Sequence, residues 1–253
     1  MSHNYILSIY KDSRGYIWIF TREGLSRYDG YTFKNYYEDK SDSTKFWGDD
    51  GGTIAEDNNG NLWVLTDKCL NKLDYSSDKI YHYHLVYNGD TLRKDHFIIK
   101  DSLLWLGSGE GIYSWNIYTQ KIKAFKHDPQ NPNSPLSGGI MDCILSKDNK
   151  IWFTSWGNGI SSFDIGSEKF THFTAAQHGM FTDPVFSLTE DNEGNIWACT
   201  LLSGKIAKLD IKSQKVRIYT NKDFNRRDPT FLKALNLRSD DLGNIWIATF
   251  TNG

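Results

Sequence analysis

Several residue types and segments are scarce in this chain, and each scarcity excludes a class of protein. Only 3 of the 253 residues are cysteine, and no Cys-x-x-Cys or Cys/His spacing typical of zinc occurs, so neither a disulfide framework nor a zinc module organises the fold. No run of about 20 apolar residues, the length that spans a bilayer, is present. The 29 basic residues nearly balance the 31 acidic ones, so the chain as a whole is not drawn to nucleic acid or anionic lipid.

Aromatic residues, in contrast, are abundant. The chain has 9 Trp, 14 Tyr and 14 Phe, and 39% of its residues are hydrophobic, which is enough for a sizeable core and excludes intrinsic disorder. Six of the tryptophans recur at intervals of 45, 42, 47, 45 and 49 residues: Trp18, Trp63, Trp105, Trp152, Trp197 and Trp246. A period near 46 that fills the chain indicates an internal repeat.

Each copy of the repeat shows the pattern of four short strands. An apolar stretch leads into a turn, the Trp starts a second strand, and two further strands follow with alternating apolar and polar residues. In four copies the turn is Asp-x-x-Gly, a hairpin signal, at Asp12/Gly15, Asp57/Gly60, Asp191/Gly194 and Asp240/Gly243. Period-2 patterning without helical periodicity is typical of a propeller blade.

We therefore predict an all-β fold: a β-propeller of four-stranded antiparallel blades, with five complete blades and part of a sixth. Residues 1–253 would form a single partial propeller. The predicted blades are residues 5–39, 51–85, 94–128, 138–176, 183–222 and 229–253, the last one incomplete. Seven blades of this length would need a longer chain, so the sequence is interpreted as part of a seven-bladed propeller.

Most of the repeated residues have a structural explanation. The repeated Trp is predicted to pack between neighbouring blades, and Trp115 aligns with core positions of the third strand. The repeated Asp residues are predicted to bond backbone N–H groups at turns, which makes them poor catalytic carboxylates. Cys143 and Cys199 are predicted to be buried free thiols. No catalytic residue, metal site or cofactor is predicted, and His82 and His84 are interpreted as an exposed strand face rather than metal ligands.

The segment YILSIYKDSRGYIWIFTREGLSRYDGYTFKNY, residues 5–36, resembles the two-component regulator propeller repeat of extracytoplasmic sensor regions in hybrid two-component histidine kinases. The connection at residues 125–144 resembles linkers between blades of the same family, and the resemblance extends over the whole chain. It implies a periplasmic sensor module, the N-terminal propeller portion of an inner-membrane protein that forms a homodimer through its full sensor. The parent would carry a histidine kinase and regulate polysaccharide-utilisation genes, whereas this part would be neither an enzyme nor a nucleic-acid-binding module.

Loops that join the second to the third strand, and one blade to the next, are expected on a single face of a propeller, where ligands bind. Only two tryptophans, Trp47 and Trp156, fall outside the repeated positions, and both map to these loops. An exposed indole can stack on the apolar face of a sugar. The predicted ligand is an oligosaccharide, with acidic or sulfated ones among the candidates because basic residues lie in the same loops. The predicted ligand-binding residues are Arg22, Trp47, Lys68, Trp156, Arg226 and Arg227.

Other interpretations of the same residues remain open. Trp47 and Trp156 could simply cap the ends of the blades, and Arg226 and Arg227 could belong to a solvated loop. The propeller could be a scaffold for protein–protein or dimer contacts without binding a ligand. A polysaccharide-active enzyme is a further alternative, which would need two converging carboxyl groups.

Overall fold

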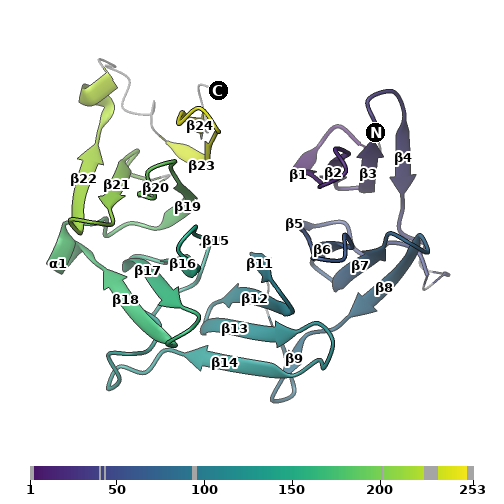
Figure 1. Ribbon diagram of the computed structural model, residues 1–253, viewed down its shortest axis with the longest axis horizontal. Helices are drawn as coiled ribbons and strands as arrows, with labels where there is room; N and C mark the ends of the chain where they lie inside the picture. Colours follow the sequence, from purple (N-terminus) through teal and green to yellow (C-terminus); the bar gives the residue numbers. More distant parts are fainter. Residues whose placement is uncertain are drawn as a thin grey trace. The chain divides into compact units, whose positions relative to one another are not determined.

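The structure, a computed structural model, describes residues 3–39, 41–42, 44–92, 96–200, 202–224 and 233–249. These residues form five four-stranded sheets, one two-stranded sheet and one short two-stranded ribbon (Figure 1). In every four-stranded sheet the strands lie in chain order, so each strand pairs with the next along the chain. The prediction of an all-β protein built from four-stranded antiparallel units is confirmed.

The strand boundaries follow the repeat closely. The first two sheets contain β1 (Ile6–Lys11), β2 (Ile17–Thr21), β3 (Gly24–Tyr28), β4 (Phe33–Tyr36), β5 (Gly51–Glu56), β6 (Leu62–Thr66), β7 (Leu70–Asp74) and β8 (Lys79–Tyr83). The third and fourth contain β11 (Phe97–Lys100), β12 (Leu103–Ser108), β13 (Gly111–Asn116), β14 (Ile122–Lys126), β15 (Cys143–Leu145), β16 (Lys150–Ser155), β17 (Gly159–Asp164) and β18 (Lys169–Phe173). The fifth contains β19 (Val185–Glu190), β20 (Ile196–Thr200), β21 (Ile206–Asp210) and β22 (Lys215–Tyr219), and the two-stranded sheet contains β23 (Ala234–Ser239) and β24 (Ile245–Thr249).

Three short elements in the connections were not predicted. They are the ribbon of β9 (Val86–Tyr87) and β10 (Asp90–Thr91), the helix α1 (Ala175–His178) and a 3₁₀ turn at Asn221–Phe224. Each is four residues or fewer, which is too short to leave a periodic pattern in the sequence. In α1 the Thr174 side chain accepts a hydrogen bond from the Gln177 N–H, so a local cap rather than an apolar face defines the helix.

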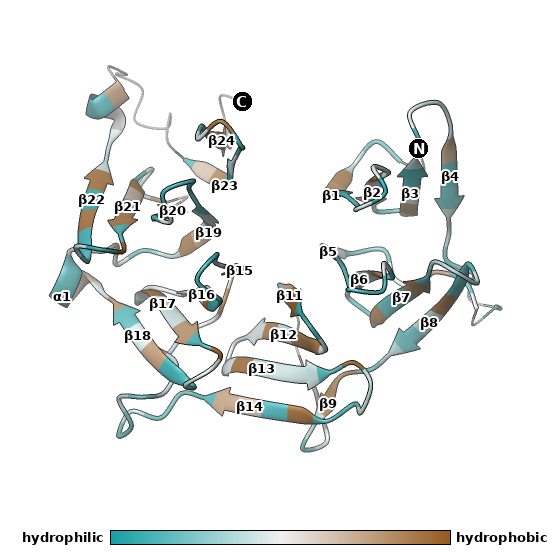
Figure 2. Ribbon diagram, viewed as in Figure 1, coloured by the Kyte–Doolittle hydropathy of each residue, from teal (hydrophilic) through white to brown (hydrophobic). Residues whose placement is uncertain are grey.

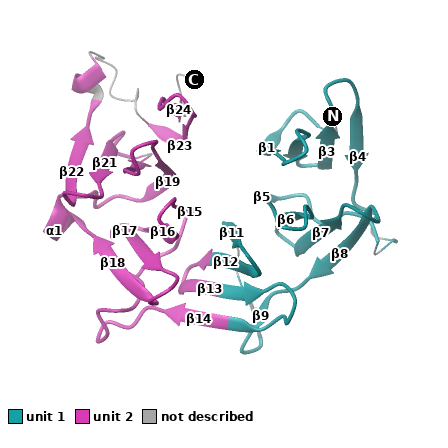
Figure 3. Cartoon of the chain, in the orientation of Figure 1, with its two compact units in different colours: residues 1–106, 114–122 teal, residues 107–113, 123–253 magenta. Residues whose placement is uncertain are grey.

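The chain divides into two compact units (Figure 3). Unit 1 is Met1–Leu106 with Ser114–Ile122, and unit 2 is Gly107–Tyr113 with Lys123–Gly253, so the division runs through the third sheet. Each unit has its own apolar cluster, around Trp18, Phe20 and Phe46 in unit 1 and around Trp152, Phe181 and Leu188 in unit 2. Hydrophobic residues lie mainly along the strands and hydrophilic ones in the connecting turns (Figure 2).

The repeated Asp does more than the sequence predicted. In all four Asp-x-x-Gly copies one carboxylate oxygen accepts the indole N–H of the repeated Trp at 2.8 Å. The other oxygen accepts backbone N–H groups two and four residues further on, as at Asn59 and Asn61 in the second copy. The turn glycine has a positive φ, +77° at Gly60, which explains why glycine occupies that position. We call this arrangement the Asp–Trp clip.

Adjacent sheets within each unit are joined at repeated positions. In unit 1 the Glu56 carboxylate accepts the N–H and hydroxyl of Ser13, at 2.7 and 2.6 Å. In unit 2 the carboxylate of Glu190, at the aligned position, accepts the N–H of Lys147 at 2.9 Å. The carboxylate at the turn of one sheet thus holds the turn of the preceding sheet.

Burial of the repeated Trp is confirmed for most copies and wrong for one. Trp18, Trp63, Trp105 and Trp152 are 0–4% exposed, and Trp115 is 3% exposed. Trp246, in contrast, is 65% exposed. The ring of Trp63 is covered by Tyr83 of its own sheet and Trp115 of the next one, whereas the sheet of Trp246 has only the strands β23 and β24 among the described residues.

Cys143 and Cys199 are buried thiols outside any disulfide, which confirms the prediction. Cys69, for which no burial was predicted, is also completely buried. Burial raises the pKa of the Cys199 thiol to about 12, so it is protonated and unreactive near neutral pH.

Candidate ligand-binding loops

Trp47 lies in unit 1, in the connection between β4 and β5, and its backbone is firmly held. Its N–H donates to Asn71 Oδ1 at 2.9 Å, and its carbonyl accepts from Asn71 Nδ2 and Thr66 Oγ1 at 2.8 and 3.0 Å. His82 and His84 pack against the indole, with ring centroids 5.6 and 5.5 Å away. The side chain is still 37% exposed, so one part of the ring can meet a ligand.

The two histidines are therefore packing partners of Trp47 rather than a plain exposed face. Burial lowers the pKa of His82, which keeps its ring neutral at pH 7, and its Nε2 lies 2.9 Å from the Lys45 carbonyl. Because a carbonyl only accepts, this nitrogen carries the proton. The contact places the His82 ring edge-on to the indole.

Lys68 is near the same segment, but its charge is matched. Its ammonium donates to the Glu38 carboxylate at 3.2 Å, and this hydrogen bond raises the pKa of Lys68. Glu38 in turn forms a bridge with Phe46, the residue before Trp47. Lys68 is thus linked through Glu38 to the segment that contains Trp47, and the Lys68–Glu38 ion pair has no net charge.

Arg22 is exposed and lies over the ring of Tyr5, with its guanidinium carbon 4.4 Å from the ring centroid. In the described part of unit 1, no hydrogen bond or ion pair joins Arg22 to Trp47 or Lys68. Arg226 and Arg227 fall outside the described residues. The predicted basic group is therefore not assembled as one cluster by the contacts that the structure describes.

Trp156 lies in unit 2, in the loop between β16 and β17, and is 48% exposed. Its N–H donates to the Gly139 carbonyl at 2.9 Å, and its ring leans on Phe186 with centroids 6.1 Å apart. Gly138 has φ +103°, and a Cβ there would come within 2.7 Å of the Trp156 carbonyl. A glycine at position 138 therefore lets the chain pass close to the Trp156 backbone, and about half of the Trp156 surface stays exposed.

Sequence reasoning missed the partners of both tryptophans. Phe186 is the second residue of β19, the first strand of the next repeat. Its place at the start of that strand is the one sequence signal that could have suggested a contact with a loop. Glu38 lies in an irregular connection with no aligned counterpart. Such pairings depend on how neighbouring sheets meet, which a repeat alignment does not contain.

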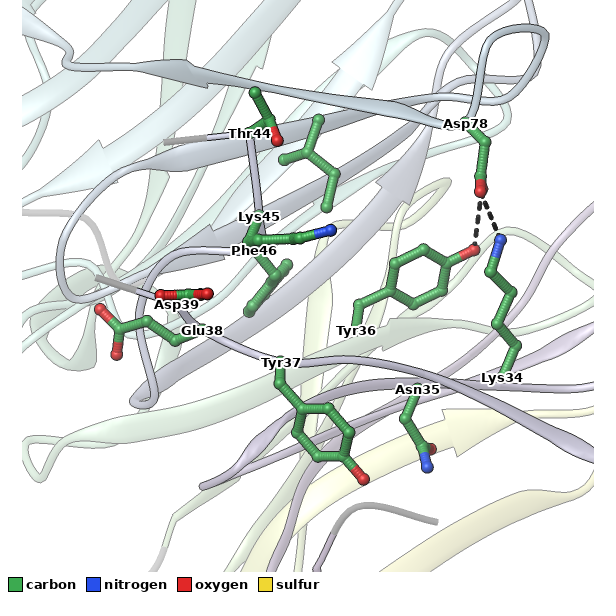
Figure 4. Close-up of a pocket in the computed structure, with 11 residues that line it drawn as sticks. Lys34, Asn35, Tyr36, Tyr37, Glu38, Asp39, Thr44, Lys45, Phe46 and Asp78 are labelled. Atoms are coloured by element: carbon green, nitrogen blue, oxygen red, sulfur yellow. Dashed lines mark hydrogen bonds and ion pairs between the residues drawn. The ribbon is translucent and has the colours of Figure 1, made fainter. Parts of the chain in front are cut away.

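A cavity of about 460 Å³ opens beside the same connection in unit 1 (Figure 4). It lies between β4 and β8 and is bordered by residues 37–39 and 44–46 of that connection. In Figure 4 the Asp78 carboxylate joins two groups of its wall, the Lys34 ammonium and the Tyr36 hydroxyl. Burial and the Asp78 charge raise the pKa of Tyr36, so its hydroxyl stays protonated and donates.

Among the described residues, no three His, Cys, Asp or Glu side chains are grouped closely enough to hold a metal ion. No helix in the described ranges has the length and apolarity needed to cross a membrane.

Comparison with known proteins agrees with the repeat. Residues 1–23 match the family model described as two component regulator propeller. No curated protein matches the chain. The chain is similar in structure to the extracellular domain of a protein described as a hybrid two component system from B. thetaiotaomicron, with TM-score 0.69, 22% identity, and coverage of 100% of this chain and 40% of that one.

Two further solved structures show the same fold. One is the extracellular domain of a protein described as a one component system from B. thetaiotaomicron, with TM-score 0.76, 20% identity, and coverage of 99% of this chain and 34% of that one. The other is virginiamycin B lyase from Staphylococcus aureus, with TM-score 0.72, 15% identity, and coverage of 96% and 77%. The chain therefore spans well under half of each two- or one-component domain. The chain shares the fold of these structures, and its residues 1–23 match the two-component regulator propeller model, in agreement with the sequence resemblance.

Proposed function

We propose that this chain is a propeller portion of the periplasmic sensor region of a hybrid two-component system, and that it takes part in recognising an oligosaccharide. The repeat family of residues 1–23 and the fold shared with extracellular domains of two-component systems support the sensor role. In this proposal the parent protein is anchored in the inner membrane, dimerises through its full sensor, and carries a histidine kinase that regulates polysaccharide-utilisation genes. The portion described here performs no catalysis.

One observation carries the ligand proposal, the exposed indole of Trp156. Aromatic side chains usually become buried in a repeat protein of this kind, as Trp18 and Trp63 are, because large rings stabilise sheet packing. Trp156 instead keeps 48% of its surface exposed while its backbone and one edge are fixed. A fixed indole with a free face is suited to stack on the C–H face of a sugar ring, because ordering it costs little entropy on binding.

Trp47 is less suited than Trp156 to stack on a sugar, because His82 and His84 already pack against its ring. Lys68 is held by Glu38, and Arg22 lies over Tyr5, so each would have to exchange a partner to bind a sulfate or carboxylate group. In this proposal Trp156 supplies stacking. Arg22, Lys68, Arg226 and Arg227 contribute only if the ligand is acidic or sulfated.

We further propose that the propeller has seven blades in the complete sensor. Two exposed faces support this. Ile9 of β1 is 62% exposed, whereas Ile54, Leu188 and Leu237, at the same distance before the repeated Trp, are 7%, 0% and 0% exposed. Trp246 is 65% exposed where other copies are buried. Further blades against β1 and β24 would cover both positions.

The experiment is calorimetry of the complete extracytoplasmic region against neutral and sulfated oligosaccharides, with Trp156→Ala as the variant. We expect Trp156→Ala to weaken binding at least about tenfold, which corresponds to about 1.4 kcal/mol. Tyr31→Ala is the control, because Tyr31 is 92% exposed in the turn between β3 and β4. Ligand can change kinase output only if it binds two sensor arrangements with different affinity, so kinase activity should change with the same concentration dependence.

Three outcomes would contradict the proposal. Unchanged affinity in Trp156→Ala would remove Trp156 from the site. Absence of binding to any oligosaccharide would favour a scaffold for dimer contacts. Release of cleaved sugar by the complete region would make it an enzyme, and a similar fold does occur in a protein described as a lyase, virginiamycin B lyase.

A further inference from the structure

The cavity between β4 and β8 is separate from the loop of Trp156 and has the features of a small-molecule site. Its volume of about 460 Å³ lies within the range of ligand pockets, about 300–1,000 Å³. Its three apolar lining residues are Tyr36, Phe46 and Ile80, and the first two are 9% and 2% exposed. These rings are packed in the apolar cluster of unit 1, so the wall that they form is rigid.

The charged groups that line the cavity are matched in pairs. Lys34 pairs with Asp78, and Lys45 lies 3.8 Å from Asp42. Glu38 is held by Lys68 at 3.2 Å. The remaining acid, Asp39, accepts the N–H and hydroxyl of Ser41, and these bonds lower its pKa, so it stays ionised. Two ammonium groups, of Lys34 and Lys45, thus face three carboxylates, and the excess negative charge, carried by Asp39, disfavours an anion in the cavity.

Uncharged polar groups complete the lining. Asn35 and Thr44 reach the cavity from β4 and from the connection between β4 and β5, and Tyr37 is 50% exposed at its rim. Lys34 and Tyr36 are fixed by Asp78, as Figure 4 shows, so the donors and acceptors on that wall are oriented before a ligand arrives. An apolar wall facing several oriented polar groups fits a ring with one apolar face and hydroxyl groups around its edge.

We propose that this cavity binds a single neutral polyhydroxylated ring, the size of a monosaccharide. The C–H face of the ring packs against Phe46 and Ile80. Its hydroxyl groups bond to Lys45, Asn35 and Asp39. This site does not depend on the proposed role of Trp156, because no residue of that loop lines it.

The test is an NMR titration of this chain with D-glucose, D-galactose and D-mannose, and with D-glucuronate and D-glucosamine as charged analogues. The signals followed are the Ile80 methyl groups and the Thr44 amide. We expect at least one neutral sugar to shift both signals saturably, and D-glucuronate, whose charge is repelled by the Asp39 carboxylate, to bind more weakly. Replacing Lys45→Met or Tyr37→Ala should weaken binding by about fivefold, the effect of one lost hydrogen bond or ring contact.

Tyr81→Ala is the matched control, because Tyr81 is 44% exposed on β8, the strand that contains Ile80, but does not line the cavity. It should leave the affinity unchanged, and the amide spectrum of each variant shows whether the chain remains folded. Two results would overturn the proposal: no saturable shift with any of the three neutral sugars, or tighter binding of glucuronate or glucosamine. Either result leaves the calorimetric test of Trp156 unaffected, so the two proposals fail separately.

Discussion

Two copies of the same hairpin, β5–β6 in unit 1 and β23–β24 in unit 2, differ in how far the repeated Trp is buried. In both, the turn Asp accepts the Trp indole N–H at 2.8 Å. Trp63 in the first is 1% exposed, whereas Trp246 in the second is 65% exposed. The Asp–Trp clip thus forms whether or not the ring is buried.

The difference shows which contacts are local and which are not. The clip uses residues within six positions of one another, so the turn itself is sufficient to form it. Burial of Trp63 requires Tyr83 and Trp115, whose ring centroids lie 5.4 and 5.7 Å away and which belong to β8 and β13. The clip therefore fixes the hairpin, and neighbouring strands supply most of the hydrophobic stabilisation.

The largest expected effect on the free energy of unfolding comes from removing the buried Trp ring. Trp63→Ala should lower the free energy of unfolding by about 3–5 kcal/mol, because it removes a fully buried ring. Trp246→Ala should lower it by less than about 1 kcal/mol in this chain, because most of its ring is already in water. Urea denaturation of both variants measures the difference. In the complete sensor, Trp246→Ala should become as costly as Trp63→Ala if further blades cover it, and equal costs in the present chain would contradict the comparison.

The next effect concerns the carboxylate. Asp57→Ala should cost about 2–3 kcal/mol, because Asp57 is 5% exposed and its loss leaves the Trp63 indole and two backbone N–H groups unpaired. Asp240→Ala should have a much smaller effect, since water can replace the exposed carboxylate. The same denaturation series measures both, and a larger loss from Asp240→Ala would show that the clip is stabilising independently of burial.

The smallest effect is a dependence on pH. Burial raises the pKa of Asp191, but hydrogen bonds from Trp197 and Asn195 outweigh it and bring the pKa to about 2, below the ordinary value of 3.8. Because the folded pKa is lower, Asp191 stabilises the fold above about pH 4, and this contribution is lost as the pH falls toward 2. Denaturation at several pH values should show that loss, and Asp191→Asn should flatten it.

Asp240 sharpens this last test. Hydrogen bonds from Asn244 and Trp246 lower its pKa to about 2 as well, although it is less buried than Asp191. Because Asp191 loses its charge over the same pH range, the contribution of Asp240 is isolated by Asp240→Asn at neutral pH. This variant should shift the Trp246 indole N–H signal and leave the rest of the spectrum unchanged. A global change in this variant would mean that the two-stranded sheet is coupled to unit 2 as tightly as the other sheets.

The candidate site was predicted less completely than the fold. The sequence picked out Trp47 and Trp156 because they are the tryptophans that break the repeat, and both are partly exposed. It also suggested a basic group, yet Lys68 is matched by Glu38 and Arg22 lies over Tyr5. Charge pairing depends on which side chains from distant turns come within hydrogen-bonding distance, and no local pattern encodes that.

The sequence by itself determined the repeating unit: four strands in order, a turn that needs Asp and Gly, and a Trp at a fixed offset. These follow from contacts over a few residues, where side-chain alternation and backbone conformation are decisive. Only the tertiary structure decided which copies of the repeated Trp are buried, how far Trp47 and Trp156 are exposed, and where a cavity opens beside the connection from β4 to β5. Those properties depend on how one sheet packs against the next, and identical repeats can differ in them because each has different neighbours.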